Sequence, residues 1–233
     1  MSRSRPIFEA FLKGRFSLFL TTMVAMFFIM PIVGRERGVV DRIFSWVTIL
    51  VLLSCMRAIS RTRLYFILMA VLTGINIVLT GAGNIISYDV PAFSIFAMGF
   101  NAFYYILVFF NIMRFVLSDE EVTGDKICGA ISAYMLMGVI WAQIYTIFYT
   151  INPECFRIPE QWLNPDTVYS FWAYYFSFTT LTTLGYGDIT PQTPLTQSYA
   201  VMQAAIGQIF LGVIVARLIA LHISHRRGAD HEG

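Results

Sequence analysis

The segment Thr182-Thr183-Leu184-Gly185-Tyr186-Gly187-Asp188, near the C-terminal end, lies between long uncharged stretches and decides how this chain folds. Two glycines in three residues break a helix, and a broken helix leaves backbone carbonyl groups without partners. Hydrocarbon tolerates such groups only where protein buries them or where they line a water-filled path. Because a row of unpaired carbonyl oxygens suits a dehydrated cation, the segment indicates an ion path.

The composition predicts a membrane protein. The chain has 233 residues, of which 57% are hydrophobic and 13% charged, with a mean hydropathy of +0.67. A soluble domain carries roughly 25% charged residues, so we expect several spans and no added soluble domain. Cys55, Cys128 and Cys155 have no metal-ligand or redox spacing, and we expect no disulfide within the chain.

Uncharged runs predict an all-α membrane protein with six transmembrane helices. Five runs reach or approach the roughly 20 residues of a spanning helix: 16–34, 64–88, 90–113, 127–153 and 189–216. A sixth, 43–56, is shorter and crosses if Arg42 and Arg57 snorkel at its ends. The first run is longer than the core of a signal peptide and no A-x-A site follows, so we interpret it as a retained helix.

The run 167–187 is predicted to enter the membrane and return on the same side. Asn164 is suited to the N-cap and Pro165 to the first helical position. The two glycines then end the helix after about 15 residues, or roughly 22 Å, short of the ~30 Å hydrocarbon core. Pro191 and Pro194 are expected to prevent an immediate helical restart. We therefore expect a re-entrant pore helix followed by an extended return.

The distribution of Lys and Arg favours the same topology. With both termini in the cytoplasm, twelve basic residues lie inside and four outside, whereas a fully crossing 167–187 gives nine and seven. Positive-inside ordering favours the first arrangement. We expect a multi-pass protein of the plasma membrane with the mouth of the re-entrant segment outside.

The order outer helix, pore helix, Thr183-Leu184-Gly185-Tyr186-Gly187-Asp188 and inner helix resembles the potassium-channel pore family of P-loop ion channels. The resemblance covers roughly residues 125–222 and is closest to small bacterial six-helix channels without a cytoplasmic regulatory domain. In this family, backbone carbonyls replace the hydration shell of K⁺ and four loops surround one ion. The resemblance therefore implies a homotetramer, with K⁺ held at Thr183, Leu184, Gly185 and Tyr186 and the outermost turn at Gly187.

The resemblance also implies roles around the selectivity filter. Tyr186 turns its ring away from the ions, and Asp188 hydrogen-bonds to the pore helix through Tyr175. The pore helix ends near Thr182 and aims a partial negative charge at the central cavity. Thr179 stands where some relatives have a glutamate, and we expect its hydroxyl to brace the filter. Leu184 replaces the commoner valine, with little expected loss of selectivity because only its carbonyl faces the ion.

The last run carries candidate gating residues. Gly207 lies at the family's spacing behind the filter, and Gly212 follows; each is either a hinge or a site of close packing. Val215 and Ile219 lie one turn apart and either form an apolar constriction or pack ordinarily.

The chain divides into a four-helix membrane domain at 1–118, a pore domain at 119–225 and a short cytoplasmic tail at 226–233. Voltage sensing needs several arginines along the fourth helix, but the run 90–113 has none and only Arg114 follows it. The polar residues within the runs are expected to bond between helices; they are Asn76, Asn101, Asn111 and Gln143. His222 and His225 either bind a metal ion, sense pH or belong to a solvated tail.

The predicted function is a potassium-selective channel that passes K⁺ passively through a homotetrameric pore in membrane lipid. We expect no cofactor, no nucleic-acid partner and no enzyme activity. Three alternatives stay open: a weakly selective cation channel, a subunit of a potassium transporter, and a non-conducting auxiliary protein. The stimulus that opens the pore is not encoded in any motif.

Overall fold

A computed structural model describes residues 14–33, 63–86, 91–119, 122–160 and 171–231. Four helices form the first part: α2 (Arg15–Val33), α4 (Arg63–Ile86), α5 (Pro91–Val116) and α6 (Gly124–Ile151). Each coincides within a few residues with a predicted run. The predicted run 43–56, together with Cys55 and Arg57, lies outside the described residues.

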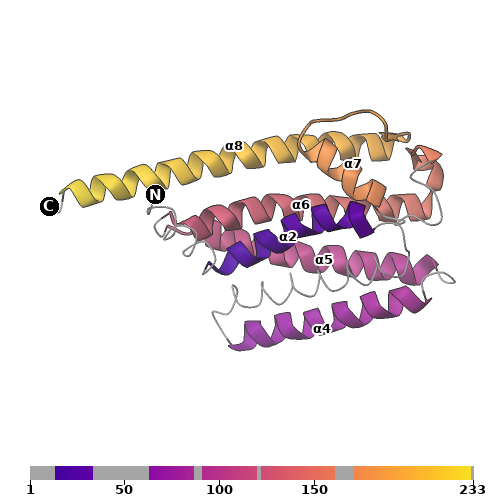
Figure 1. The fold of residues 1–233 in the computed structure, drawn as a ribbon, viewed down its shortest axis with the longest axis horizontal. Helices are drawn as coiled ribbons and strands as arrows, with labels where there is room; N and C mark the ends of the chain where they lie inside the picture. The colour runs from indigo at the N-terminus through magenta and orange to yellow at the C-terminus, as the bar shows by residue number, and fades with distance from the viewer. Residues whose placement is uncertain (1–13, 34–62, 87–90, 120–121, 161–170, 232–233) are drawn as a thin grey trace.

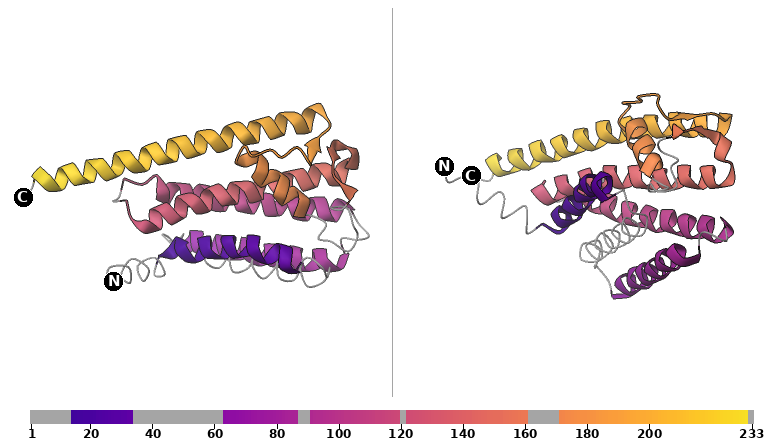
Figure 2. Two further views of the ribbon diagram at one scale, coloured as in Figure 1. Left: turned by 45° about the horizontal axis from the view of Figure 1, so that its top comes forward. Right: turned by 45° about the vertical axis from the view of Figure 1, so that its right-hand side comes forward.

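The second part consists of the short helix α7 (Phe171–Leu181) and the long helix α8 (Pro194–His231). Figure 1 shows α6 in the middle, with α2 and α5 on one side and α7 and α8 on the other. Both views in Figure 2 keep α4 and α8 on opposite sides of the bundle. The pore helix α7 thus lies between α6 and α8.

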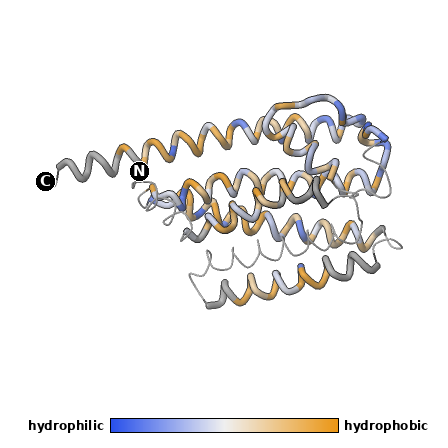
Figure 3. The backbone as a smooth tube through the Cα atoms, in the orientation of Figure 1, coloured by the Kyte–Doolittle hydropathy of each residue, from blue (hydrophilic) through white to orange (hydrophobic). Residues whose placement is uncertain are grey.

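The described helices confirm an α-helical membrane protein. Three helical segments are long and apolar enough to cross a bilayer: Ala92–Val116, Gly124–Ile151 and Pro194–Leu221. In α2 and α4, shorter apolar stretches cover Phe16–Ala25 and Ile67–Leu79. Hydrophilic residues gather around the loop that follows α7, as Figure 3 shows. The count of six spans stays a prediction.

Polar side chains join the helices at the predicted positions Asn76, Asn101 and Gln143. Asn76 of α4 donates to the Asn101 amide oxygen of α5 at 2.7 Å, and Gln143 of α6 donates to the Tyr174 hydroxyl of α7 at 3.0 Å. Asn111 donates to the Leu107 carbonyl within α5. Such bonds hold apolar helices in one register, since polar groups in hydrocarbon need partners.

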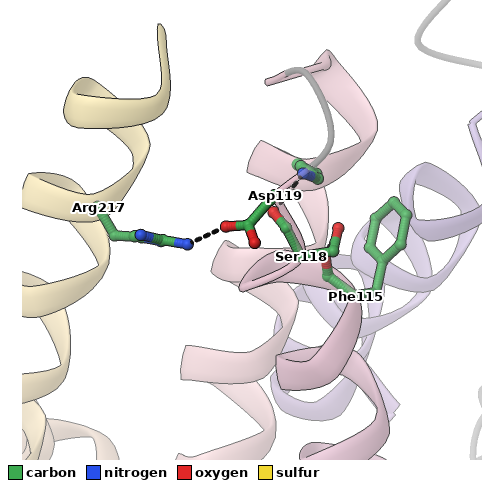
Figure 4. A network of polar contacts seen from close by, with 5 residues as sticks. Phe115, Ser118, Asp119 and Arg217 are labelled. Atoms are coloured by element: carbon green, nitrogen blue, oxygen red, sulfur yellow. Dashed lines mark hydrogen bonds and ion pairs between the residues drawn. The ribbon is translucent and has the colours of Figure 1, made fainter. Parts of the chain in front are cut away.

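A cluster of contacts ties α2, α5, α6 and α8 together where α6 begins. The Phe16 amide at the start of α2 donates to the Asp125 carboxylate at 2.8 Å. Buried Lys126 donates to the Ser118 carbonyl at the end of α5, at 2.9 Å. Figure 4 shows the next residue, Asp119, reaching across to form an ion pair with Arg217 of α8.

A two-stranded antiparallel ribbon, absent from the sequence prediction, lies at the opposite end. The 3₁₀ turn η1 (Pro153–Cys155) follows α6 and leads into β1 (Phe156–Arg157), which pairs with β2 (Thr190–Pro191). The Gln192 amide also donates to the Cys155 carbonyl at 2.9 Å. The ribbon fastens the chain after the filter loop to the end of the outer helix.

The chain after α7 agrees with the predicted extended return, with one correction, while entry into a membrane stays a prediction. Between Leu181 and Pro194 the described backbone contains no α-helix, as expected for an extended return. Pro194, however, does not prevent the restart: it is the first residue of α8, where the missing N–H costs no helical bond. Thr193 caps the helix and exchanges backbone-to-hydroxyl bonds with Thr196. The predicted helix start at Asn164 and Pro165 lies outside the described residues.

Helix α8 runs without a break through residue 225, where the sequence places the end of the pore domain. Residues 226–231 therefore continue the inner helix, and Figure 1 shows this end of α8 projecting past the other helices.

Candidate functional site

The loop after α7 has an alternating backbone. Thr183, Gly185 and Gly187 have φ angles of 60°, 50° and 77°, and these are the positive φ values among the described residues. Glycine adopts such angles at little cost, whereas threonine does so only under constraint. Residues 182–188 are all exposed in the single chain. The loop is therefore a specific, partly strained conformation on the surface of the single chain.

The inner end of this loop is fastened to the end of α7. The Thr179 carbonyl accepts from the amides of Leu184, at 2.8 Å, and Gly185, at 3.1 Å. The Thr182 amide and hydroxyl both bond to the Phe178 carbonyl, at 3.0 and 2.7 Å. The last carbonyls of a helix need partners outside the regular ladder, and here the amides of Leu184 and Gly185 in the loop are such partners.

The contribution of Thr179 differs from the expectation. Its hydroxyl donates to the Phe176 carbonyl of its own helix at 3.0 Å and is not the predicted brace for Asp188. A threonine hydroxyl in a helix commonly bonds back to the preceding turn, and this geometry turns it away from the loop. Thr179 therefore holds the loop through its backbone carbonyl.

The outer end of the loop rests on Tyr175, in the arrangement that the sequence predicts. The Tyr175 hydroxyl donates to Asp188 Oδ2 at 2.7 Å. The Tyr186 ring lies parallel to the Tyr175 ring, with centroids 6.4 Å apart and planes 7° apart. Asp188 Oδ1 also accepts from the Ile189 amide at 3.0 Å. One side chain of α7 thus contacts both Tyr186 and Asp188.

Close packing between α7 and α8 occurs at Gly207. A Cβ atom at this position would lie 2.6 Å from the Leu181 carbonyl oxygen. That carbonyl also accepts from the Tyr134 hydroxyl of α6 at 3.1 Å. Close packing against Leu181 therefore explains why residue 207 is a glycine, whereas hinge motion at Gly207 stays a prediction.

The remaining gating candidates lie farther along α8. A Cβ at Gly212 meets nothing within 4 Å in this chain. Val215 and Ile219 are 52% and 55% exposed, so neither packs into the single subunit. They remain available to line a pore or to contact lipid. The side chains of His222 and His225 lie outside the described part.

Sequence reasoning missed a buried polar network around the pore helix. Gln203 of α8 donates to Ser177 of α7, at 3.0 Å to its carbonyl and 2.8 Å to its hydroxyl oxygen. Tyr145 of α6 donates to Gln203 Oε1 at 2.7 Å, and the Ser177 hydroxyl donates to the Gly138 carbonyl at 2.7 Å. The sequence signal that could have indicated this network is Gln203 itself, a polar residue inside the apolar run 189–216.

Comparison with known proteins agrees with this arrangement. Residues 136–223, less than half of the chain, match a family model described as an ion channel. The match runs from within α6, through α7 and the filter loop, to the apolar part of α8. Residues 136–223 are therefore similar to the ion-channel family, and this similarity indicates a channel rather than an enzyme.

Among curated proteins, the chain is similar to Two-pore potassium channel 4 of Arabidopsis thaliana. The two are 27% identical over 112 residues, which is 48% of this chain and 39% of the relative. The chain thus aligns with about two fifths of the length of the relative that it matches. No solved structure matches the chain significantly.

Proposed function

We propose that this chain is the subunit of a potassium-selective channel in which four copies surround one pore and K⁺ passes down its gradient. The observation that carries the proposal is the alternating backbone of residues 183–187. Alternation of right- and left-handed residues gathers successive N–H groups on one face, which leaves the carbonyl oxygens for the other face. A row of carbonyls can replace the hydration shell of K⁺ when four chains contribute equally.

Exposure of the loop and of α8 supports assembly into an oligomer. Leu184 and Tyr186 are 55% and 68% exposed in the single chain. Large apolar side chains of α8 are also uncovered: Leu195, Val201, Met202, Ile206, Ile209, Leu211, Val213, Val215, Ile219 and Ile223. Neighbouring copies and lipid cover these surfaces in the proposed homotetramer.

The proposed orientation places the filter mouth outside the plasma membrane and both termini in the cytoplasm. It rests on the excess of Lys and Arg on the predicted inner side. In this orientation Val215 and Ile219 lie on the cytoplasmic side of the filter. The gate proposed for them is an apolar constriction that closes by dewetting.

Ion flux through the purified protein in liposomes tests the function. We expect a Ba²⁺-sensitive K⁺ flux and a reversal potential that follows K⁺ in mixed K⁺ and Na⁺. Equal permeability to the two ions contradicts potassium selectivity and leaves the weakly selective cation channel. A cross-linking ladder that stops at the dimer contradicts the tetramer and favours a transporter subunit.

The matched variants are Gly185→Ala and Gly74→Ala. A Cβ at position 185, where φ is +50°, adds about 1–2 kcal/mol of strain in each subunit. Gly74 has no atom within 4 Å of a built Cβ and lies in α4, away from the filter. We expect Gly185→Ala to abolish K⁺ flux and Gly74→Ala to preserve it; equal flux in both contradicts the filter assignment.

A further inference from the structure

Three helices meet at a single buried side chain on the inner helix. Gln203 is 0% exposed, as are Ser177 and Tyr145, the two residues that bond to its amide. Tyr145 comes from α6, Ser177 from α7 and Gln203 from α8. The Ser177 hydroxyl in turn donates a hydrogen bond to the Gly138 carbonyl of α6. The network therefore closes around the body of the pore helix.

Both the oxygen and the nitrogen of the Gln203 side-chain amide form hydrogen bonds. Its oxygen accepts from Tyr145, and its nitrogen donates to the two oxygens of Ser177. Buried polar networks specify one arrangement when every member is satisfied, because any slip leaves unpaired groups in a low-dielectric interior. An apolar contact is not directional and permits α7 to rotate or slide by small amounts. This network therefore fixes the rotation and height of α7.

The network lies directly behind the anchor of the filter. Ser177 precedes Thr179 by two residues in the same turn of α7, and the Thr179 carbonyl holds the amides of Leu184 and Gly185. Gly207, four residues after Gln203, lies on the same face of α8 and contacts Leu181. Gln203 thus aligns the helix at the point where Gly207 allows the closest approach.

We propose that Gln203 is a positioning residue for the filter, which it aligns by bonding α8 to Ser177 of the pore helix and to Tyr145 of the outer helix. The inference rests on the proposed channel function. A displaced α7 moves the Thr179 carbonyl and, with it, the first carbonyls of the filter. Because selectivity depends on where these oxygens lie, loss of the network lowers the permeability ratio of K⁺ to Na⁺ before it prevents assembly.

A purely structural role makes a different prediction. If Gln203 only filled space, a substitution that keeps its shape would leave the permeability ratio unchanged at every pH. Gln203→Glu separates the two roles because it has nearly the same shape. A protonated carboxyl group keeps one acceptor for Tyr145 and one O–H donor for Ser177, whereas an ionised carboxylate has acceptors only. Burial favours the protonated form of such a carboxyl group, so the two forms are compared at a low and a high pH.

The test measures reversal potentials of liposome-reconstituted wild type and Gln203→Glu at pH 5 and pH 8. The Gln203→Glu protein is expected to be selective at pH 5 and to lose about tenfold in permeability ratio at pH 8, the effect of about one buried hydrogen bond. The wild-type ratio is expected to stay constant. Tyr145, the titratable residue bonded to position 203, is a phenol and stays neutral in this range.

Asn76→Asp is the matched control, since Asn76 is also a buried amide and bonds to Asn101 in the front helices. Its permeability ratio is expected to equal that of wild type at both pH values. Tyr145→Phe removes one hydroxyl from the network and is expected to lower the ratio at both pH values. This variant decides the question if Gln203→Glu fails to assemble.

The outcomes separate the two proposals. A selective wild type with unchanged ratios in Gln203→Glu and Tyr145→Phe overturns the positioning role alone. A ratio that falls equally in Asn76→Asp also overturns it, because any buried acid then has the same effect. A wild-type channel without potassium selectivity overturns the proposed function and the positioning role with it.

Discussion

The inner-helix residue Gly207 lies so close to the pore-helix residue Leu181 that a Cβ at position 207 would be 2.6 Å from the Leu181 carbonyl oxygen. The obstructing atom belongs to the backbone, so it cannot move away as a flexible side chain can. Helices α7 and α8 therefore need glycine at this crossing to keep their present separation.

We predict that Gly207→Ala is less stable than Gly212→Ala by about 1–3 kcal/mol, the usual cost of overpacking. Both changes gain the same helix propensity, but a Cβ at Gly212 meets no atom within 4 Å. The measurement is SDS-induced unfolding of the detergent-solubilised proteins followed by circular dichroism. Equal midpoints would show that the inner helix can move away from Leu181 without cost.

The bond between Tyr175 and Asp188 supports a prediction about the outer mouth. Tyr175→Phe removes the hydroxyl that donates to Asp188 and keeps the ring that lies beside Tyr186. Because the exposed carboxylate is then hydrated by water, the variant loses only about 1 kcal/mol of stabilising free energy per subunit. Potassium current through this variant should decay severalfold faster during sustained recording.

The control for this change is Tyr199→Phe, which keeps the ring contacts with Trp141 and Phe148 on the side of α8 that faces α6. Its decay is expected to match wild type. A Tyr175→Phe current that also decays at the wild-type rate would exclude a role for the hydroxyl bond in holding the outer mouth.

Two aspartates near the start of α6 are predicted to differ in their effect on stability. Asp125 accepts from the Phe16 amide at the open end of α2, and removing a capping side chain costs about 1 kcal/mol. The Asp119 side chain is 90% exposed, and exposed ion pairs of its kind with Arg217 contribute about 0–1 kcal/mol. Asp125→Ala should therefore lower the melting temperature more than Asp119→Ala, by differential scanning fluorimetry. A larger decrease in melting temperature for Asp119→Ala would show that the ion pair with Arg217 stabilises the fold more than the bond between Asp125 and Phe16.

Cys155 should be chemically inert in the folded protein. Burial raises the pKa of its thiol, and only the thiolate reacts with alkylating reagents. The thiol is therefore protonated at pH 7.4 and is also shielded, since the residue is 3% exposed. Iodoacetamide labelling, read by mass spectrometry of the peptide, should be slow. Glu154→Cys provides an exposed comparison one residue away, and equal labelling at 154 and 155 would contradict the buried position.

The sequence predicted the parts of the fold that depend on local chemistry. Glycines at 185 and 187 indicated a helix break with unusual backbone angles, and both residues have positive φ. Uncharged runs indicated the positions of α2, α4, α5 and α6, because burial in lipid requires long apolar stretches. The pairing of Tyr175 with Asp188 was also predictable, since the family resemblance fixes their separation along the chain.

The missed features depend on which helix faces meet. The Gln203 network joins residues 26 and 58 positions apart in the sequence. Helices that are apolar all round carry no stripe that identifies the buried face, so the partners of Gln203 were not predictable. The direction of the Thr179 hydroxyl depends on a side-chain rotamer, which the sequence does not specify. The ribbon consists of only two residues in each of β1 and β2, too few to give a strand pattern in the sequence.

Helix α8 extends well past its apolar part. Its 38 residues extend about 57 Å at 1.5 Å per residue, whereas the apolar part ends at Leu221. The last ten residues therefore carry the helix about 15 Å past the bilayer-matched part without a joint. Helix α8 is held near its start by the contacts of Gln203 and Gly207 and farther along by the ion pair of Arg217 with Asp119. In the proposed channel, a tilt of the C-terminal part of α8 therefore acts first on this ion pair and then on the contacts behind the filter.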